Sequence, residues 1–177
     1  MAHIPVRDGV PGIISLFEFD PEASRPLNAL AQVVLRRPST LTPAERELIA
    51  TYVSTLNGCR FCAGSHAAAA RHLLGDDAPV VEAVRADPST APVSEKMRAL
   101  LAIAARVQRG GRSVSEEEVA AARAEGATDQ EIHDTVLIAA AFCMYNRYVD
   151  GLATLVPGEE ELDGIGAHLA ASGYGAR

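Results

Sequence analysis

The sequence has little of what several protein classes require. Trp is absent, aromatic residues make up 5% of the 177 residues, and Cys occurs three times. A disulfide-held scaffold would be denser in cysteine, and a chain of this length can bury enough surface without disulfides. The longest apolar run, from Val136 to Tyr145, is about half of the ~20 residues that a membrane-spanning helix needs. With no signal-peptide core at the N-terminus either, we expect a cytoplasmic protein that does not enter a membrane.

Positive charge is also scarce. The formal net charge is −7, and Lys and Arg form no cluster along the chain. Nucleic acid is therefore not an expected partner, because its binding depends on a basic patch. Hydrophobic residues nevertheless reach 48%, and many of them are alanine. Alanine has the highest helix propensity, so this composition favours close-packed helices over sheets.

Apolar periodicity, capping boxes and Gly or Pro stops divide the chain into helices, and no segment alternates as a strand would. The expected helices cover residues 27–37, 43–56, 59–74, 94–109, 115–125 and 129–155, with a short apolar segment at 80–84. Residues 1–25 are expected to be irregular, because Pro5, Pro11 and Pro21 interrupt them and Pro26 follows directly. The fold predicted for residues 1–177 is thus an all-α, single-domain bundle of six to seven helices.

The last expected helix is apolar nearly all round between Val136 and Val149. Such a helix is normally covered on both sides, by its own domain or by another subunit. Within it, Asn146, Arg147 and Asp150 must find polar partners if they are buried. These three residues are interpreted mainly as structural, with a role at a site or an interface as the alternative.

One short stretch carries chemistry: Cys59, Cys62 and His66 follow Asn57-Gly58, where a new helix should begin. Residues three or four apart share a helix face, so both thiols and the imidazole would lie together. The free amides and positive dipole end of a helix start favour a thiolate, most strongly at Cys59. An imidazole can take the thiol proton, and a second thiol can resolve a sulfenic acid into a disulfide. The pattern therefore indicates redox chemistry.

Two plainer interpretations compete with the redox hypothesis. Cysteine and histidine in an alanine-rich helix are often only small or hydrogen-bonded core residues. A metal site is also possible in principle, but zinc sites usually add a second ligand pair a dozen or more residues away. The third cysteine, Cys143, lies among Phe142, Met144 and Tyr145 and is interpreted as core. No metal or cofactor is therefore expected.

The segment from Glu45 to His66, ERELIATYVSTLNGCRFCAGSH, resembles the AhpD-like alkyl hydroperoxidase (peroxidase-related) branch of the carboxymuconolactone decarboxylase family. That branch has a glutamate, eleven residues and then CxxCxxxH, which Glu47, Cys59, Cys62 and His66 match. The resemblance implies an AhpD-like helical fold and the reduction of organic hydroperoxides. It assigns Cys62 as the peroxidatic cysteine, Cys59 as the resolving one, and Glu47 with His66 as a proton relay.

The resemblance also implies partners. A small-molecule hydroperoxide would be the substrate, and an external dithiol of thioredoxin-like or lipoyl type would reduce the disulfide. A homo-oligomer is implied, either a trimer or a hexamer, with a dimer as the fallback. One departure is Phe61, because the type member of the branch has a histidine between its two cysteines. The missing histidine removes one relay group.

The sequence therefore supports three functional hypotheses. The first is a peroxidase that cycles Cys59 and Cys62 between dithiol and disulfide. The second is a protein disulfide reductase or redox sensor that uses the same pair. The third is an oligomeric scaffold or binding protein that keeps the thiols without using them.

Overall fold

The computed structural model describes residues 1–175, and all regular secondary structure in this part of the chain is helical, with no β-strand. Its α-helices are α1 (Gly12–Phe19), α2 (Pro21–Arg36), α3 (Pro43–Leu56), α4 (Arg60–Leu74), α5 (Pro79–Ala86), α6 (Glu95–Arg109), α7 (Glu116–Ala124), α8 (Asp129–Gly151) and α9 (Glu159–Ser172). Two 3-10 turns, η1 (Gly75–Asp77) and η2 (Gly111–Ser113), join neighbouring helices. The all-α prediction is confirmed, with more helices than the six to seven expected.

The N-terminal segment is where the prediction of irregular structure is wrong. Residues 1–11 have no helix, but α1 and the first turns of α2 occupy most of the range from 12 to 25. Pro21 does not interrupt α2 but begins it. The amide at the first helical position has no hydrogen-bond partner within the helix, so proline, which lacks an amide hydrogen, is tolerated there. The Asp20 side chain caps this helix by accepting hydrogen bonds from the amides of Glu22 and Ala23. Pro26 lies inside α2 and does not end it.

The C-terminal part also differs from the prediction. The last expected helix ends at Gly151 rather than at residue 155, and a further helix, α9, follows it. The signal for α9 was present but weak: Leu162, Ile165 and Leu169 recur at helical spacing. A run of three glutamates at its start, which suits a helix N-terminus, looks like a surface loop when it is read alone.

The capping boxes are confirmed. α3, α7 and α8 each begin with such a box. The side chain of the residue just before the helix accepts a hydrogen bond from the amide of the third helical residue, and the glutamate side chain at that third position accepts one from the amide of the capping residue. Each box satisfies two amides that would otherwise lack partners. The sequence therefore locates these three helix starts correctly.

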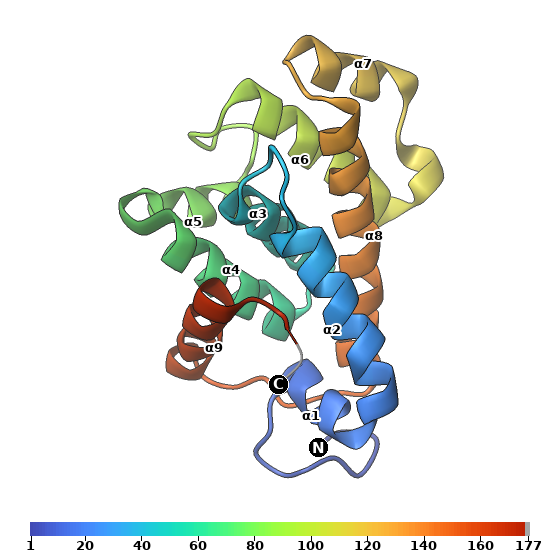
Figure 1. The fold of residues 1–177 in the computed structure, drawn as a ribbon, viewed down its shortest axis with the longest axis vertical. Coiled ribbons are helices and arrows are strands. Elements are labelled where there is room, and N and C mark those ends of the chain that lie inside the picture. Colours follow the sequence, from blue (N-terminus) through green and yellow to red (C-terminus); the bar gives the residue numbers. More distant parts are fainter. Residues whose placement is uncertain (176–177) are drawn as a thin grey trace.

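α4 lies between α3 on one side and α9 on the other, while α8 packs against α3 and α6 (Figure 1). α7 lies at one end of the molecule, and α1 lies at the opposite end together with the N-terminus (Figure 1). The main core forms where α2, α3, α6 and α8 meet, and the fully buried side chains there include Leu35, Ile49, Leu100, Leu101, Ile103 and Ile138. A separate small apolar cluster surrounds Cys59 and Cys62. The thiols therefore lie in their own apolar compartment beside the core.

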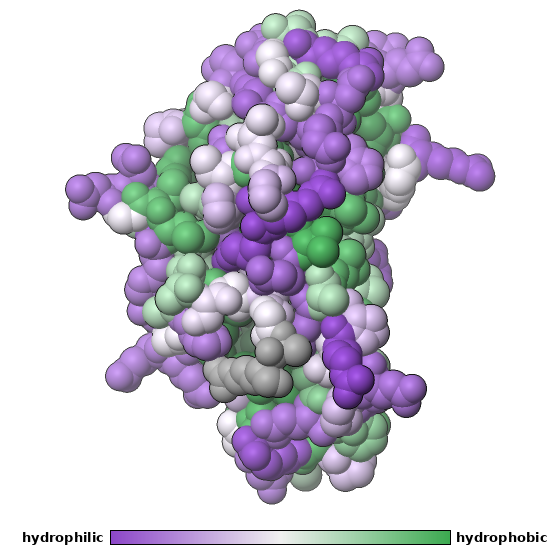
Figure 2. All heavy atoms as spheres, in the orientation of Figure 1, coloured by the Kyte–Doolittle hydropathy of each residue, from purple (hydrophilic) through white to green (hydrophobic). Residues whose placement is uncertain are grey.

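α8 is buried on one side only. Ile138, Phe142 and Tyr145 face the core, whereas Met144 is 41% exposed. On the face that Figure 2 shows, apolar surface occurs as separate patches between polar side chains. No helix within residues 1–175 combines the length and the apolarity that crossing a membrane would take.

Glu131, at the start of α8, is a buried carboxylate and gives a prediction about stability. Its side chain is 1% exposed and accepts hydrogen bonds from Lys96, Thr40 and the amide of Thr128 at 2.7–2.9 Å. Burial alone would raise the pKa of Glu131, but these donors lower it to about 2. Because the folded-state pKa lies below the unfolded one, this stabilisation is present above pH ~4.5 and is lost as pH falls toward 2.

We expect Glu131→Gln to lower the free energy of unfolding at pH 7 by about 2 kcal/mol, since a hydrogen-bonded buried charge is lost. The difference from the natural protein should shrink at pH 3, and urea unfolding at both pH values measures it. Glu118→Gln is the matched control, because Glu118 holds the same capping position on α7 but is 22% exposed. If the difference in unfolding free energy were the same at both pH values, the Glu131 charge would not be its source.

Candidate functional site

The turn between α3 and α4 positions the two thiols. α3 ends at Leu56, and Gly58 then adopts a φ of +72°, a conformation that glycine takes without strain. The amide of Cys59 bonds back to the carbonyl of Ser54 at 3.1 Å. Cys59 is the capping residue before α4, and Cys62 lies in the first turn of that helix. The predicted helix start near Cys59 is confirmed.

Both thiols are reduced and buried. Cys59 is 0% exposed and Cys62 is 3% exposed. A hydrogen bond from the Cys59 thiol to Cys62 raises the pKa of Cys59 far above its usual range, and burial and the nearby Asp150 carboxylate raise it further.

An apolar wall encloses the dithiol. Val149 and Phe61 complete the buried cluster around the two sulfurs. The ring of Phe61 lies against the backbone of Gly12, where an added Cβ would come within 2.3 Å of ring carbons. Gly12 also has a φ of +52°, so both its conformation and its contact require glycine. Phe61, which replaces the relay histidine of the type member, thus joins α1 to the thiol compartment.

The structure brings Glu47 and His66 into direct contact. Glu47 lies on α3 and is completely buried, and His66 lies on α4 one turn beyond Cys62. The Nδ1 atom of His66 is 2.7 Å from Oε2 of Glu47. The edge of Phe142 packs against the imidazole at a centroid distance of 4.6 Å. Because Nδ1 is occupied by the carboxylate, Nε2 is the nitrogen that remains for a thiol proton.

Two further residues complete the surroundings of Glu47. The hydroxyl of Tyr174 donates to Oε1 of Glu47 at 2.6 Å and lies 3.2 Å from Nδ1 of His66. Nη2 of Arg36 also donates to Oε1 at 2.6 Å, and the guanidinium lies 5.0 Å from the centroid of the Tyr174 ring. The tyrosine ring stacks on His66 at 5.9 Å. Glu47 therefore accepts hydrogen bonds at both oxygens from three side chains.

These contacts fix the charge of the group. Burial alone would raise the pKa of Glu47, but His66, Arg36 and Tyr174 together lower it. Burial and the charge of Glu47 raise the pKa of Tyr174 well above its usual value, so its hydroxyl remains a donor. A carboxylate held in this way orients the imidazole and stabilises its protonated form. The arrangement can accept a thiol proton at His66 while Glu47 stays ionised.

The sequence did not identify Arg36 and Tyr174. Arg36 lies at the end of α2 and Tyr174 follows α9, so neither is near the CxxC segment in the chain. No spacing rule relates such distant positions, and only packing of α9 against α4 brings Tyr174 to the site. A local sequence pattern cannot reveal these contacts, because they arise from tertiary structure alone.

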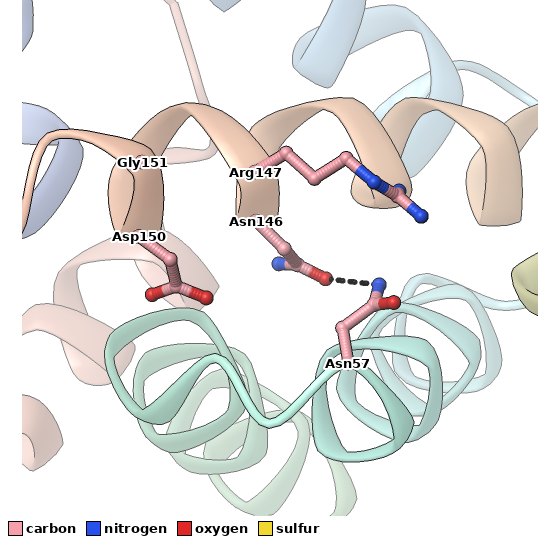
Figure 3. A pocket seen from close by; sticks show the side chains of 5 residues that line it. All are labelled: Asn57, Asn146, Arg147, Asp150 and Gly151. Carbon is pink, nitrogen blue, oxygen red and sulfur yellow. Dashed lines mark hydrogen bonds between the residues drawn. The ribbon is translucent and has the colours of Figure 1, made fainter.

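A polar cavity of about 480 Å³ lies beside the thiols, between α8 and the turn after α3 (Figure 3). The amide of Asn57 donates to Asn146 at 2.8 Å, and Asn146 donates to Ser54 at 3.0 Å. Asp150 extends from α8 toward the same turn (Figure 3), and its carboxylate interacts with the Cys59 thiol. The buried Asn146 is thus satisfied by structural partners, whereas Asp150 lies at the thiol site.

Cys143 is set apart from Cys59 and Cys62. It is partly buried on α8, and its sulfur accepts a hydrogen bond from the Asn57 amide at 3.7 Å. Cys59 and Cys62 belong to another apolar cluster, on the first turn of α4. No group of three or more His, Cys, Asp or Glu side chains within residues 1–175 is arranged to hold a metal ion.

A second cavity, a cleft of about 640 Å³, has Cys59, the first residue of the thiol pair, in its wall. Cys59 lies in its wall at one end, beside apolar residues of α4, α9 and the segment before α9. Arg71, Arg85 and Glu82 line it where α4 approaches α5. Small molecules can therefore approach the thiols along α4.

Residues 21–91, which contain all four predicted site residues, match the carboxymuconolactone decarboxylase family. No curated protein sequence matches the chain significantly.

Three solved structures resemble the chain over most of its length. A peroxidase-related protein from Silicibacter sp. is 29% identical with a TM-score of 0.78, and the match covers 88% of this chain and 80% of that one. An uncharacterized peroxidase-related protein from Ralstonia eutropha, described as an alkylhydroperoxidase AhpD core, is 26% identical with a TM-score of 0.78, covering 89% and 82%. A protein of unknown function from Agrobacterium tumefaciens, named as a candidate antioxidant defence protein AhpD, is 27% identical with a TM-score of 0.67, covering 84% and 99%.

Proposed function

Because the chain belongs to the carboxymuconolactone decarboxylase family and has the AhpD-like fold, we propose that it is a thiol-dependent peroxidase with an antioxidant role. Its substrates are organic hydroperoxides. The observation that carries the proposal is the buried cluster that holds both Cys59 and Cys62 at the start of α4, the helix that also carries His66 in contact with Glu47. One group of residues thus supplies a nucleophile, a resolving thiol and a base.

The reaction has two steps at the protein. The Cys62 thiolate attacks one oxygen of the hydroperoxide, the O–O bond breaks, and the alkoxide leaves as an alcohol after taking a proton. Cys62 is now a sulfenic acid, and the peroxide has gained two electrons. The Cys59 thiol then attacks the sulfenic sulfur, which forms the disulfide and releases water.

The neighbouring groups have distinct roles in this scheme. His66 accepts the Cys62 proton and returns it to the leaving alkoxide, while Glu47 stabilises the imidazolium. Arg36 and Tyr174 keep Glu47 ionised and in place. Cys59 remains protonated until it resolves the sulfenic acid, which agrees with the raised pKa of its thiol. The resemblance of the CxxC segment to the AhpD-like branch assigns Cys62, rather than Cys59, as the peroxidatic residue, and the proposal follows that order.

A disulfide reductase or redox sensor is the alternative use of the same pair. Its substrate would be a protein disulfide, which must bring its sulfur into contact with a cysteine sulfur of this chain. Cys59 and Cys62 are 0% and 3% exposed, whereas a cleft leads to them from the surface. Burial behind a cleft favours a small hydroperoxide over a protein partner as the oxidant.

The proposal includes partners outside the chain. A dithiol of thioredoxin-like or lipoyl type returns the disulfide to the reduced state by thiol–disulfide exchange and becomes a disulfide itself. A homo-oligomer, trimer or hexamer, with a dimer as the fallback, is also part of the proposal. The exposed side of α8, with Met144 at 41% exposure, offers apolar surface for such an interface.

Titration with an alkyl hydroperoxide tests the proposed function directly. We expect one equivalent of cumene hydroperoxide to convert Cys59 and Cys62 into an intramolecular disulfide while Cys143 stays reduced. The reason is that Cys59 and Cys62 are hydrogen-bonded to each other, whereas Cys143 bonds to Asn57. Peptide mapping by mass spectrometry after alkylation of free thiols gives the pairing. A disulfide that includes Cys143, or thiols that remain reduced after minutes, would count against the peroxidase.

A further inference from the structure

The cleft that leads to the dithiol has two chemically different ends. Near Cys59 its wall contains the apolar Val156 and Leu162, packed against the cluster that contains the two thiols, together with the charged Arg60 and Glu159. At the other end Arg71 and Arg85 lie on α4 and α5. The cleft volume of about 640 Å³ falls within the range of about 300–1,000 Å³ that small-molecule sites occupy.

The charged end has an excess of positive charge. Arg71 and Arg85 share a single carboxylate, that of Glu82, at 3.0 and 2.8 Å. Two guanidinium groups against one carboxylate leave one positive charge, although the whole chain carries −7. The Nε atom of Arg85 is buried and has no hydrogen-bond partner. That atom is closed to a ligand, but the side chains of Arg71 and Arg85 are 35% and 32% exposed, so their guanidinium groups can meet an anion in the cleft.

The distance between the two ends sets the length of the ligand. Arg60, Gly64 and Arg71 all line the cleft and lie on one face of α4. At 1.5 Å per residue, the twelve residues from Cys59 to Arg71 span about 18 Å. This length is comparable with the extended chain of a long fatty acid.

We propose that the cleft binds a long-chain hydroperoxide with a terminal carboxylate, that is, a fatty acid hydroperoxide. The carboxylate pairs with Arg71 and Arg85, the chain lies along the apolar wall, and the peroxide group reaches the dithiol. This substrate class rests on the proposed peroxidase function. The chemical step is the one already described, with the hydroperoxide reduced to the corresponding hydroxy fatty acid and the dithiol oxidised to the disulfide.

Two measurements test the carboxylate site. The first compares the rate at which the reduced protein is oxidised by linoleic acid hydroperoxide, by its methyl ester and by cumene hydroperoxide. The second measures calorimetrically the binding of laurate, which carries the carboxylate and the chain but no peroxide. We expect the acid to react about tenfold faster than the ester, which corresponds to about 1.4 kcal/mol from a charge-assisted contact.

Variants of the arginine end make the test specific. The double variant Arg71→Gln with Arg85→Gln should abolish the preference for the acid and weaken laurate binding at least tenfold, while the cumene hydroperoxide rate stays unchanged. Glu82→Gln should act in the opposite direction, because it removes the competing carboxylate. Arg123→Gln is the matched control, since Arg123 pairs with Asp129 on the surface and does not line the cleft.

The outcomes separate the two proposals. If the thiols react with cumene hydroperoxide but acid and ester react equally and laurate does not bind, the cleft proposal fails and the peroxidase stands. If no peroxide oxidises the thiols, while laurate binding depends on Arg71 and Arg85, the peroxidase fails and the carboxylate site stands. If the double variant still preferred the acid over the methyl ester, the proposed carboxylate site would also be overturned, because the carboxylate would then bind elsewhere.

Discussion

Cys62→Ser is expected to abolish the reaction of the protein with organic hydroperoxides. A serine hydroxyl is not ionised near neutral pH and cannot replace the thiolate as the attacking group. Rapid-mixing kinetics with cumene hydroperoxide, followed by quantifying the remaining thiols, measures the loss. The substitution is nearly isosteric in a buried site, so an unchanged melting temperature would show that the loss is chemical.

The matched variant is Cys59→Ser. It removes the resolving thiol and the donor to Cys62 but keeps the attacking sulfur. We therefore expect it to react once and to accumulate a sulfenic acid at Cys62, which a dimedone probe traps and excess peroxide over-oxidises. Cys143→Ser should leave the rate unchanged. A sulfenic acid trapped on Cys59 in the Cys62→Ser protein would reverse the order of the two cysteines.

The second large effect is expected at Glu47. Glu47→Gln removes the charge that stabilises the His66 imidazolium, so the thiol at Cys62 should ionise less readily. Acid–base assistance of this kind is typically worth about 10²–10⁴-fold, and the oxidation rate at neutral pH should fall by a factor in that range. The oxidation rate of His66→Ala should fall by at least as large a factor. The alkylation rate against pH should shift to higher pH in both variants.

Stability has to be measured alongside this rate, because Glu47 also pairs with Arg36 in a buried position. Breaking a buried pair typically costs about 3–5 kcal/mol, so the variant should melt at a lower temperature. Tyr174→Phe is the control: it removes one hydrogen bond to Glu47 but keeps the carboxylate against His66. It should lower stability while moving the pH profile much less. An unshifted profile in Glu47→Gln would leave Glu47 with a structural role only.

Much of the fold could be predicted from the sequence because its signals are local. Capping boxes such as Thr42 with Glu45 depend on residues three apart, and the structure has them where they were expected. Pro21 misled the prediction because proline stops a helix in its interior but starts one at its first position. The α9 helix was missed because its apolar residues are few and follow a run of glutamates.

The candidate site could be predicted only in part, for the same physical reason. Cys59, Cys62 and His66 lie within one helical stretch, so their spacing brings them together once the helix forms. The contact of Glu47 with His66 requires α3 to pack against α4, and the family pattern, rather than the spacing, pointed to it. Tyr174 follows α9 and Asp150 lies on α8, and no local signal connects either one to the thiols.

The Tyr174 contact has a consequence for how the protein matures during synthesis. Glu47 leaves the ribosome long before its hydroxyl partner, which lies 127 residues later in the chain. Domains begin to fold from the N-terminal side as they emerge, so α3 and α4 can pair while Glu47 still lacks this donor. The hydrogen-bond network around Glu47 is complete only when the chain has been synthesised as far as Tyr174. A nascent or C-terminally clipped chain would then carry both thiols without the tyrosine that helps to hold their base in place.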